Sequence, residues 1–429
     1  MKLEFRRTSS SKKVWPDLHN GRVRSGVLAL AVATVLLPLP TTPLAVPTAQ
    51  TGPGSDPRQL RRLEIEHFRY AGAFRLPATE SGGRYFSYGG SHIAINPDRP
   101  SMFVSTSNRV AEVSIPELVT SSRIEDLPVA EILQPIADPA EGRWKEVAAA
   151  DVVLSGLLVH DRRLFASAII SYDANNTQTV SHFSRSLSLL EKSASPLQRV
   201  GDPGKAGFVA GYMAPVPIEW RTLLGAPAIT GQCCVSIVSR TSQGPAAWAW
   251  DPQEVVSGGP AKASSLVHYE GNHTTLGPWN GSNPTYGGTT MVGGVALING
   301  TRTAVFLGSN GMGPFCYGDG VSDKAAHNPA KEKCYDPARV DKGQHAYPYR
   351  YQMWAYDLND WAAVRAGQRN PWEVVPYAVW PLELPFPEPA TRIGGVAFDP
   401  VRRLLYFSQL RAEQGGFAYR PIMHAYFVP

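Results

Sequence analysis

The stretch TRIGGVAFDPVRRLLYFSQ, residues 391–409, shows the unit from which most of the chain is built. A glycine pair leads into a short apolar run, Asp399-Pro400 makes a turn, and a second apolar run ends at Ser408. Two apolar runs joined by such a turn predict a hairpin of antiparallel strands. Similar stretches recur at residues 89–107, 155–167, 223–239 and 293–309. Five copies of one unit indicate a repeat architecture.

Each hairpin is followed by stretches that predict further strands. Third strands are expected at residues 109–115, 179–187, 246–250, 351–358 and 422–428. Fourth strands are expected at residues 129–134, 197–200, 266–270 and 377–384. The last unit lacks a fourth strand, but residues 70–77 alternate like a strand and resemble residues 377–385. We therefore expect the N-terminal strand to complete the last sheet, so that no sheet edge stays open.

This recurrence predicts an all-β fold, and within that class a five-bladed β-propeller closed by an N-terminal strand. The hairpin turns are spaced 64, 70, 69 and 100 residues apart, and they lie at Asn96, His160, Thr230, Asn299 and Asp399. The last interval is long because residues 310–349 form an insertion. A larger propeller and a two-sheet β-sandwich are the alternatives, but a sandwich does not require five similar hairpins.

Composition and charge exclude some classes of partner. The chain has 429 residues with 39 Gly and 37 Pro, which favours β-structure with many loops. Its formal charge of +5 comes from residues 1–50, because the remainder has 34 basic and 34 acidic residues. A neutral body without a basic stripe argues against nucleic acid as a partner.

Residues 1–49 have the features of a secretory signal peptide: a basic segment, an apolar run at residues 26–37, and then prolines and small residues. The twelve apolar residues of this run are too few to span a bilayer comfortably, so we favour export over a membrane anchor. Residues 50–66 predict a linker, and residues 67–429 the propeller domain. We expect a secreted or periplasmic monomer without a stable membrane span.

The insertion at residues 310–349 contains a pair of cysteines that predicts a disulfide. Cys316 and Cys334 bracket a loop with no obvious core of its own, and a bridge between them would restrain it. A zinc site formed by Cys316, His327, Cys334 and His345 is the alternative, with ten, six and ten residues between the ligands. This spacing matches no familiar zinc finger, and an exported protein favours the disulfide.

Two further groups of residues leave open the state of a cysteine pair and the presence of a metal ion. Cys233 and Cys234 are adjacent, so they form either a vicinal bridge or a pair of buried thiols. Structural calcium is a weaker alternative to zinc in the insertion, because its acidic residues lack the order of an EF-hand. These acidic residues are Asp319, Asp323 and Asp341. No catalytic cofactor is expected.

The lengths of the loops predict which face of the fold carries the functional site. The turns within the hairpins are short, whereas the remaining connections are long. In a propeller these two classes of connection lie at opposite faces, so one face should be plain and the other built up. The long connections are residues 78–91, 135–150, 201–221, 271–290, 310–349 and 410–419. Long loops on a rigid scaffold are where binding groups usually lie.

The built-up face contains candidates for catalysis and binding. His92 stands where other units have glycine, and it is either a general acid or base or a hydrogen-bonded filler of the central channel. Aromatic rings beside Arg and Asn suit a sugar, although such rings also pack loops together. The expected ligand-binding residues are Trp144, Trp220, Trp279, Tyr286, Tyr347, Arg350 and Arg411.

On its leader, its five hairpins and its terminal strand exchange, the chain resembles secreted propellers of the carbohydrate-active type over residues 70–429. Five-bladed glycosidases of the arabinanase and fructosidase type are similar and imply acidic residues on the inner strands, where this sequence offers Asp151. Propeller polysaccharide lyases are also similar and imply a His or Tyr as base and acid and an Arg that neutralises a uronate. The matching candidates are His92, Tyr88, Arg84 and Arg392.

The resemblance and the loops together predict an exported carbohydrate-active enzyme, either a polysaccharide lyase or a glycoside hydrolase. Its partner would be a polysaccharide or an oligosaccharide at the long-loop face. The alternative is a non-catalytic propeller that binds glycan or protein there. Because the long loops are unlike one another, we expect one site and not a repeated pocket in every blade.

Overall fold

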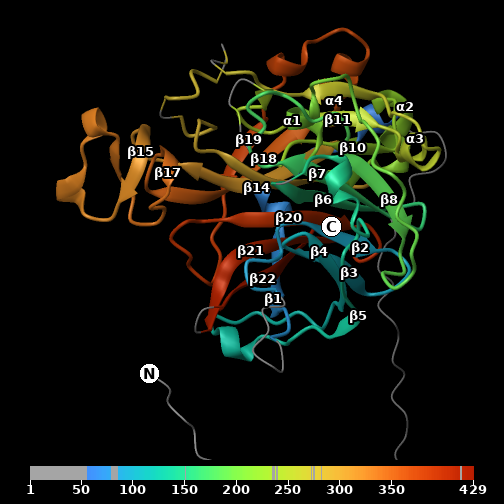
Figure 1. Ribbon diagram of the computed structural model, residues 1–429, viewed down its shortest axis with the longest axis horizontal. Coiled ribbons are helices and arrows are strands. Elements are labelled where there is room, and N and C mark those ends of the chain that lie inside the picture. The colour runs from blue at the N-terminus through green and yellow to red at the C-terminus, as the bar shows by residue number, and fades with distance from the viewer. Residues whose placement is uncertain are drawn as a thin grey trace, which may run out of the picture. The chain divides into compact units, whose positions relative to one another are not determined.

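The protein is described from a computed structural model that covers residues 56–78, 86–149, 151–233, 237, 240–271, 273, 276–281, 283–415 and 418–429. These residues form six β-sheets with only short helices between them, so the fold is all-β as predicted (Figure 1). The α-helices are α1 (Ala206–Val209), α2 (Arg221–Leu224), α3 (Pro252–Val256) and α4 (Leu358–Arg365). No helix in the described part of the chain is long and apolar enough to cross a membrane.

Five of the sheets follow one another along the chain. The first has the order β2 (Ile93–Asn96), β3 (Ser101–Thr106), β4 (Arg109–Ser114) and β5 (Ile132–Ala137). The second has β6 (Val152–His160), β7 (Arg163–Ile170) and β8 (His182–Ser186). The third has β9 (Met213–Pro215), β10 (Ala228–Thr230), β11 (Ala247–Trp250) and β12 (Ala263–Val267). In the second sheet a single bridge between His182 and Gln198 stands where a fourth strand was expected.

The last two of these sheets contain the hairpins that are clearest in the sequence. The fourth has the order β13 (Met291–Leu297), β14 (Thr303–Gly311), β18 (Tyr349–Asp357) and β19 (Ala378–Pro381). The fifth has β20 (Ile393–Asp399), β21 (Leu404–Gly415), β22 (Ala418–Phe427) and β1 (Arg69–Arg75). The pairing of β1 with β22 is antiparallel and matches Tyr70 with Tyr426, as expected from the sequence (Figure 1).

The turn residues stabilise the hairpins as their types predict. The Asp399 carboxylate accepts hydrogen bonds from the backbone N–H groups of Val401 and Arg402, both at 2.9–3.0 Å. The side-chain oxygen of Asn96 accepts one from the N–H of Asp98 at 3.0 Å. These Asx turns hold the chain reversal between the first two strands of the first and fifth units.

The first strands of the five sheets contact one another in a cycle. β2 packs on β6, β6 on β9, β9 on β13, β13 on β20, and β20 returns to β2. The glycines of the repeated motif permit this close approach. A Cβ atom at Gly156 would lie 1.9 Å from the carbonyl oxygen of Gly211, and one at Gly293 would lie 2.2 Å from that of Gly394. Only glycine lets the backbones of neighbouring first strands lie this close.

A serine hydroxyl group within each of two second strands, β21 and β7, also joins neighbouring segments. Ser408 donates a hydrogen bond to the carbonyl oxygen of Gly90, and Ser167 donates one to that of Gly211 at 2.9 Å. Both bonds link one sheet to the chain that enters the next first strand. Large apolar side chains fill the space between neighbouring sheets, with fully buried Trp354 and Trp361 between the third and fourth. Each such side chain contributes about 1.5–3 kcal/mol to folding.

The third unit corrects the expected position of one hairpin. The sequence placed its turn at Thr230, but the first strand is β9 and Thr230 ends the second strand, β10. The connection between β9 and β10 is long and contains α2. β9 and β10 are too short to show a clear alternation of apolar and polar residues, so the sequence pattern instead predicts the hairpin at the apolar run of residues 223–239. The error matters because it assigned Trp220 and Arg221 to the wrong face.

Two other segments differ from expectation. Residues 56–68 lie within the fold instead of acting as a free linker, because Leu63 is fully buried and its N–H donates to Thr303. The connection expected at residues 410–419 is largely strand, because β21 and β22 continue beyond the sheet as a paired arm.

The insertion forms a small sheet of its own that projects to one side (Figure 1). It consists of β15 (Cys316–Val321), β16 (Lys333–Tyr335) and β17 (Lys342–His345). A disulfide joins Cys316 to Cys334, so neither sulfur is free to ligate zinc. Cys233 is also disulfide-bonded, while Cys234 lies outside the described residues.

Candidate functional site

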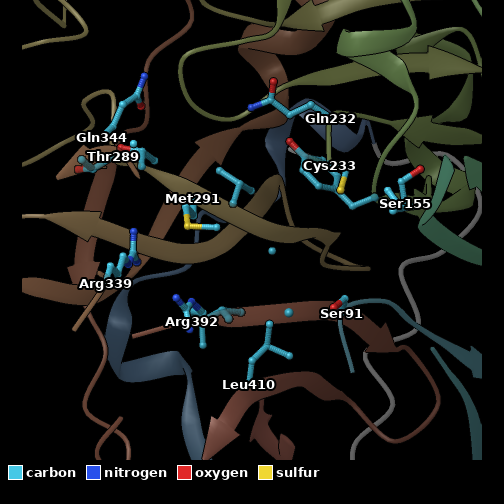
Figure 2. A pocket seen from close by; sticks show the side chains of 18 of the residues that line it. Ser91, Ser155, Gln232, Cys233, Thr289, Met291, Arg339, Gln344, Arg392 and Leu410 are labelled. Atoms are coloured by element: carbon cyan, nitrogen blue, oxygen red, sulfur yellow. The ribbon is translucent and has the colours of Figure 1, made fainter. Parts of the chain in front are cut away.

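A cavity of about 1630 Å³ opens where the first strands begin, and we name it the loop-end pocket (Figure 2). Its floor includes the entries to four first strands, at His92, Val153, Met291 and Ile393. Its walls come from the long connections, including the insertion. A second, smaller cavity of about 310 Å³ lies at the other end of the same strands, and we name it the turn-end pocket.

His92 lies at the floor of the loop-end pocket and is largely buried. Burial lowers the pKa of its imidazole to about 4, and a hydrogen bond to the backbone of Leu154 opposes this only in part. The ring is therefore neutral at physiological pH and can accept a proton. The bond to Leu154 also joins the first sheet to the second, which is a contact that a hydrogen-bonded filler would make.

Tyr88 and Arg411 form a pair at the rim of the pocket. The Arg411 guanidinium lies over the Tyr88 ring at 5.0 Å, and the Tyr419 ring lies 5.5 Å from the same ring. Tyr88 is half exposed, so one side of its ring is open to a ligand. Both Tyr88 and Arg411 have a φ of 60°, in the left-handed region that non-glycine residues rarely adopt. Such strained residues cluster at functional sites.

The insertion supplies another wall through a buried ionic network. The Asp336 carboxylate accepts hydrogen bonds from His345 Nδ1 at 2.7 Å and from the Tyr349 hydroxyl at 2.5 Å. His345 Nε2 faces the carbonyl oxygens of Gly318 and Asp341, both at 3.1 Å. Because all of these partners are acceptors, the ring satisfies them only as the imidazolium.

The protonation states in this network follow from burial and from the hydrogen bonds. Burial alone would lower the pKa of His345, but the hydrogen bond and charge of Asp336 outweigh it and hold the pKa above its ordinary value. Burial would likewise raise the pKa of Asp336, yet the bonds from His345 and Tyr349 hold it below its ordinary value. The network thus holds β15 and β17 in place as part of the pocket wall.

Polar side chains from several other segments also line the pocket, and the sequence did not single them out. They are Ser91, Ser155, Gln232, Thr289, Arg339 and Gln344. Its acidic residues, Glu270 and Asp341, come from loops and not from first strands. Gln232 was missed because of the misplaced third hairpin, since the segment expected to be a short turn in fact reaches this pocket. Arg339 lies in the insertion, and no local motif marks it.

The structure brings some of the predicted site residues together and separates others. Tyr88, His92, Trp279 and Arg392 line the loop-end pocket, and Arg411 contacts Tyr88. Arg84 lies outside the described residues. The five other predicted ligand-binding residues do not line this pocket; they are Trp144, Trp220, Tyr286, Tyr347 and Arg350.

Three of these five are held by packing, which corrects their assignment to a ligand. Trp220 is fully buried and donates from Nε1 to the Thr301 carbonyl at 2.9 Å. Tyr286 is buried and stacks on Tyr269 with 5.6 Å between ring centroids. Trp144 donates to Asp138 at 2.9 Å and packs edge-on against a phenylalanine.

The other two contact neighbouring residues in or near the insertion. The Tyr347 ring lies edge-on to that of Tyr335, with 5.7 Å between centroids. Arg350 donates to the Gln352 side chain at 3.0 Å. Aromatic and arginine content alone could not separate loop packing from ligand contact.

Metal ligation finds no support in the residues proposed for it. Among the described residues, no group of three or more His, Cys, Asp or Glu side chains could hold a metal ion. His327 Nδ1 accepts a backbone hydrogen bond from Tyr335 at 2.9 Å, and Asp319 pairs with Lys333 at 2.7 Å. Asp323 caps a short helical turn by accepting from Ala325 N–H at 2.9 Å. The zinc and calcium alternatives therefore do not correspond to assembled sites.

Comparisons with known proteins give only distant likenesses. No family model matches the chain, and no curated protein matches it. Structure neighbours include a glycosyl hydrolase from Bacteroides ovatus, at 10% identity over 86% of this chain and 96% of that chain, with a TM-score of 0.36. A member of the DUF4221 family from Bacteroides vulgatus aligns over 82% of this chain and 81% of that chain at 10% identity, with a TM-score of 0.35. A luciferin-regenerating enzyme aligns over 83% of this chain and 77% of that chain at 8% identity, with a TM-score of 0.33. Likenesses at this level carry no argument about activity.

Proposed function

We propose that the protein is an exported carbohydrate-active enzyme, a polysaccharide lyase or a glycoside hydrolase, that works in the loop-end pocket of a five-bladed propeller. The cyclic contacts of the five first strands support the propeller, as does the completion of the last sheet by β1. The disulfide between Cys316 and Cys334 is typical of exported proteins and supports the interpretation of residues 1–49 as a signal peptide.

The observation that carries the proposal is the size and asymmetry of the loop-end pocket. At about 1630 Å³ it exceeds the roughly 300–1,000 Å³ of ordinary small-molecule sites, so it suits several linked sugar rings. Each sheet contributes different residues to it, which favours one site over a pocket repeated in every blade. The partly open rings of Tyr88 and Trp279 offer flat faces for the C–H patches of sugars.

The walls contain groups for either reaction. For a lyase, neutral His92 is the candidate base and Tyr88 the candidate acid. For a hydrolase, the candidates are the two carboxyl groups of the pocket, Glu270 and Asp341. These acids lie on loops, and the one acidic residue of the first strands, Asp399, lies at the turn end of β20. The lack of acidic residues at the loop ends of the described first strands therefore does not exclude hydrolysis.

The experiment is a product assay on neutral and acidic polysaccharides. Purified protein is incubated with each substrate while new reducing ends and the absorbance of unsaturated uronates are followed. A lyase generates both products, whereas a hydrolase generates reducing ends alone. Tight retention of one polysaccharide without any product would instead establish the non-catalytic alternative.

Variants then assign the roles. We expect His92→Ala to reduce lyase activity by about 100-fold, the lower range for loss of a general acid or base. His160→Ala is the matched control, because His160 is also a buried histidine with a lowered pKa but lies at the turn end of β6. Full activity in His92→Ala would remove this residue from the reaction.

A further inference from the structure

Three arginines gather on one wall of the loop-end pocket. Arg339 and Arg392 line it, and Figure 2 shows their side chains on the same side of the cavity. Burial lowers the pKa of Arg392, and the charges of Arg411 and Arg339 lower it further. Arg339 and Arg411 are therefore each close enough to Arg392 to repel its charge.

None of the three is paired with an acid. Arg339, Arg392 and Arg411 form no ion pair with any carboxylate of the described residues. Some partly buried arginines elsewhere in the same fold do have such partners. Arg75 and Arg420, for example, both pair with Glu413, at 3.4 and 2.9 Å. Like charges gathered without counter-charge destabilise the free protein, and a bound anion would relieve this cost.

Of the two acids that attract Arg392, Glu388 is engaged elsewhere. Glu388 and Asp341 act on Arg392 only through longer-range attraction. The Glu388 carboxylate accepts hydrogen bonds from the backbone N–H groups of Ala390 and Arg392, at 3.1 and 3.4 Å. It therefore stabilises the turn before β20 and leaves the Arg392 guanidinium without a carboxylate partner.

Arg339 is held rigidly in place for a ligand. It is 8% exposed, and its guanidinium lies 3.7 Å from the centroid of the Tyr349 ring. Nη2 donates to the Ala390 carbonyl at 2.8 Å, whereas the buried Nε has no partner among the described residues. Few rotamers remain to be lost on binding, so an anion would meet a preorganised donor.

We propose that Arg339 and Arg392, with Arg411 beside them, form a subsite for a carboxylate or sulfate group carried by the sugar ligand. This inference rests on the proposed function and narrows it to acidic polysaccharides. Guanidinium groups suit these oxyanions because their N–H donors match the geometry of two oxygens. The two oxyanions share this chemistry, and separate probes distinguish them.

Calorimetric titration at constant ionic strength tests the subsite. The probes are a galacturonic acid trisaccharide, its methyl ester, a sulfated disaccharide and inorganic sulfate. We expect the free acid or the sulfated sugar to bind at least 10-fold more tightly than the uncharged ester. Arg392→Gln should remove this preference and leave binding of the ester unchanged.

Arg163→Gln is the matched control. Like Arg392, Arg163 has no ion pair among the described residues, and like Arg339 it has a buried Nε without a partner, but it starts β7 at the other end of the sheet. Arg392 is only half-buried, so its replacement should leave the thermal unfolding temperature unchanged, which confirms that the variant is folded. Arg339→Gln gives a second measurement on the same wall.

The outcomes separate this inference from the proposed function. Equal binding of ester and free acid, with Arg392→Gln unchanged, would overturn the subsite and leave a neutral-glycan function standing. Binding of inorganic sulfate that Arg392→Gln abolishes, without binding of any sugar, would support the subsite and overturn the carbohydrate function. Absence of binding by every probe would overturn the subsite, and the product assay on neutral polysaccharides would then decide the proposed function.

Discussion

The two ends of the five first strands differ although the same strands connect them. At the loop end the cavity is about 1630 Å³ and is lined by arginine, histidine and amide side chains. At the turn end it is about 310 Å³ and mainly apolar, with Leu157, Met213 and Phe398 among its walls. The strands set the spacing at both ends, so the difference comes from the connections. The five first strands therefore provide the scaffold, and the long loops provide most of the polar side chains that line the pocket.

A substitution in the middle of the five first strands should have the largest effect on stability. The positions of both the loop end and the turn end depend on how these strands pack. A Cβ atom at Gly156 would meet the Gly211 carbonyl oxygen at 1.9 Å, and a backbone atom cannot move aside easily. We expect Gly156→Val to lower the free energy of unfolding by about 3 kcal/mol, at the upper end of overpacking effects. Urea unfolding checks this.

The control for Gly156→Val is Gly259→Ala. A Cβ atom at Gly259 would meet nothing within 4 Å. Gly259→Ala should therefore leave the free energy of unfolding within about 0.5 kcal/mol of that of the parent protein. If Gly156→Val were equally harmless, the close approach of first strands could not be what holds the two ends in register.

This comparison also explains what the sequence could and could not predict. Hairpins with a glycine pair, an Asx turn and a closing hydroxyl combine local turn chemistry with apolar runs, so most strands were predicted. The disulfide in the insertion was predicted because Cys316 and Cys334 bracket a loop with no obvious core and because an exported protein favours a disulfide. The third unit failed because β9 and β10 are each three residues long and leave no clear alternation.

The site was predictable where it touches the repeat and where the long loops carry aromatic residues, as at Tyr88 and Trp279. His92 and Arg392 adjoin first strands, so alignment of the units located them at the loop end. Arg339 and Gln344 reach the pocket through the insertion, whose fold depends on pairing between β15 and β17. Such non-local pairing leaves no periodic pattern in the sequence. Trp220 was placed at the wrong end because a single misassigned turn reverses the direction of every connection near it.

The stability of the loop end and the stability of the turn end should respond oppositely to pH. This effect is smaller than that expected for Gly156→Val. The pKa of His345 is raised at the loop end, so its contribution is fully present below about pH 6.5 and is lost as pH rises through the folded value. Burial lowers the pKa of His160 at the turn end, so stability there falls as pH drops below about 6.5 and the unfolded chain takes up a proton. Each group changes the free energy of unfolding by at most about 1.4 kcal/mol per pH unit.

Hydrogen exchange of individual segments measures these responses. Between pH 6 and 9, after correction for intrinsic rates, β15 and β17 should lose protection while β6 does not. His345→Gln should remove this response, because a neutral amide replaces the imidazolium between Asp336 and the Gly318 carbonyl. Protection of β15 and β17 that does not change with pH would mean that His345 is not held as a cation.

The smallest expected effects come from one exposed apolar residue at each end. Ile218 is 72% exposed beside the turn-end pocket, and Tyr88 is 50% exposed at the loop end. We expect Tyr88→Asn to weaken sugar binding about five-fold through loss of roughly 1 kcal/mol of ring contact, and asparagine tolerates the left-handed backbone there. Ile218→Ser should change neither binding nor, by more than about 0.5 kcal/mol, the free energy of unfolding. Calorimetric titration of both variants with the sugar that binds best decides the matter. Equal weakening by Ile218→Ser would place the ligand at the turn end and reverse the roles assigned to the two pockets.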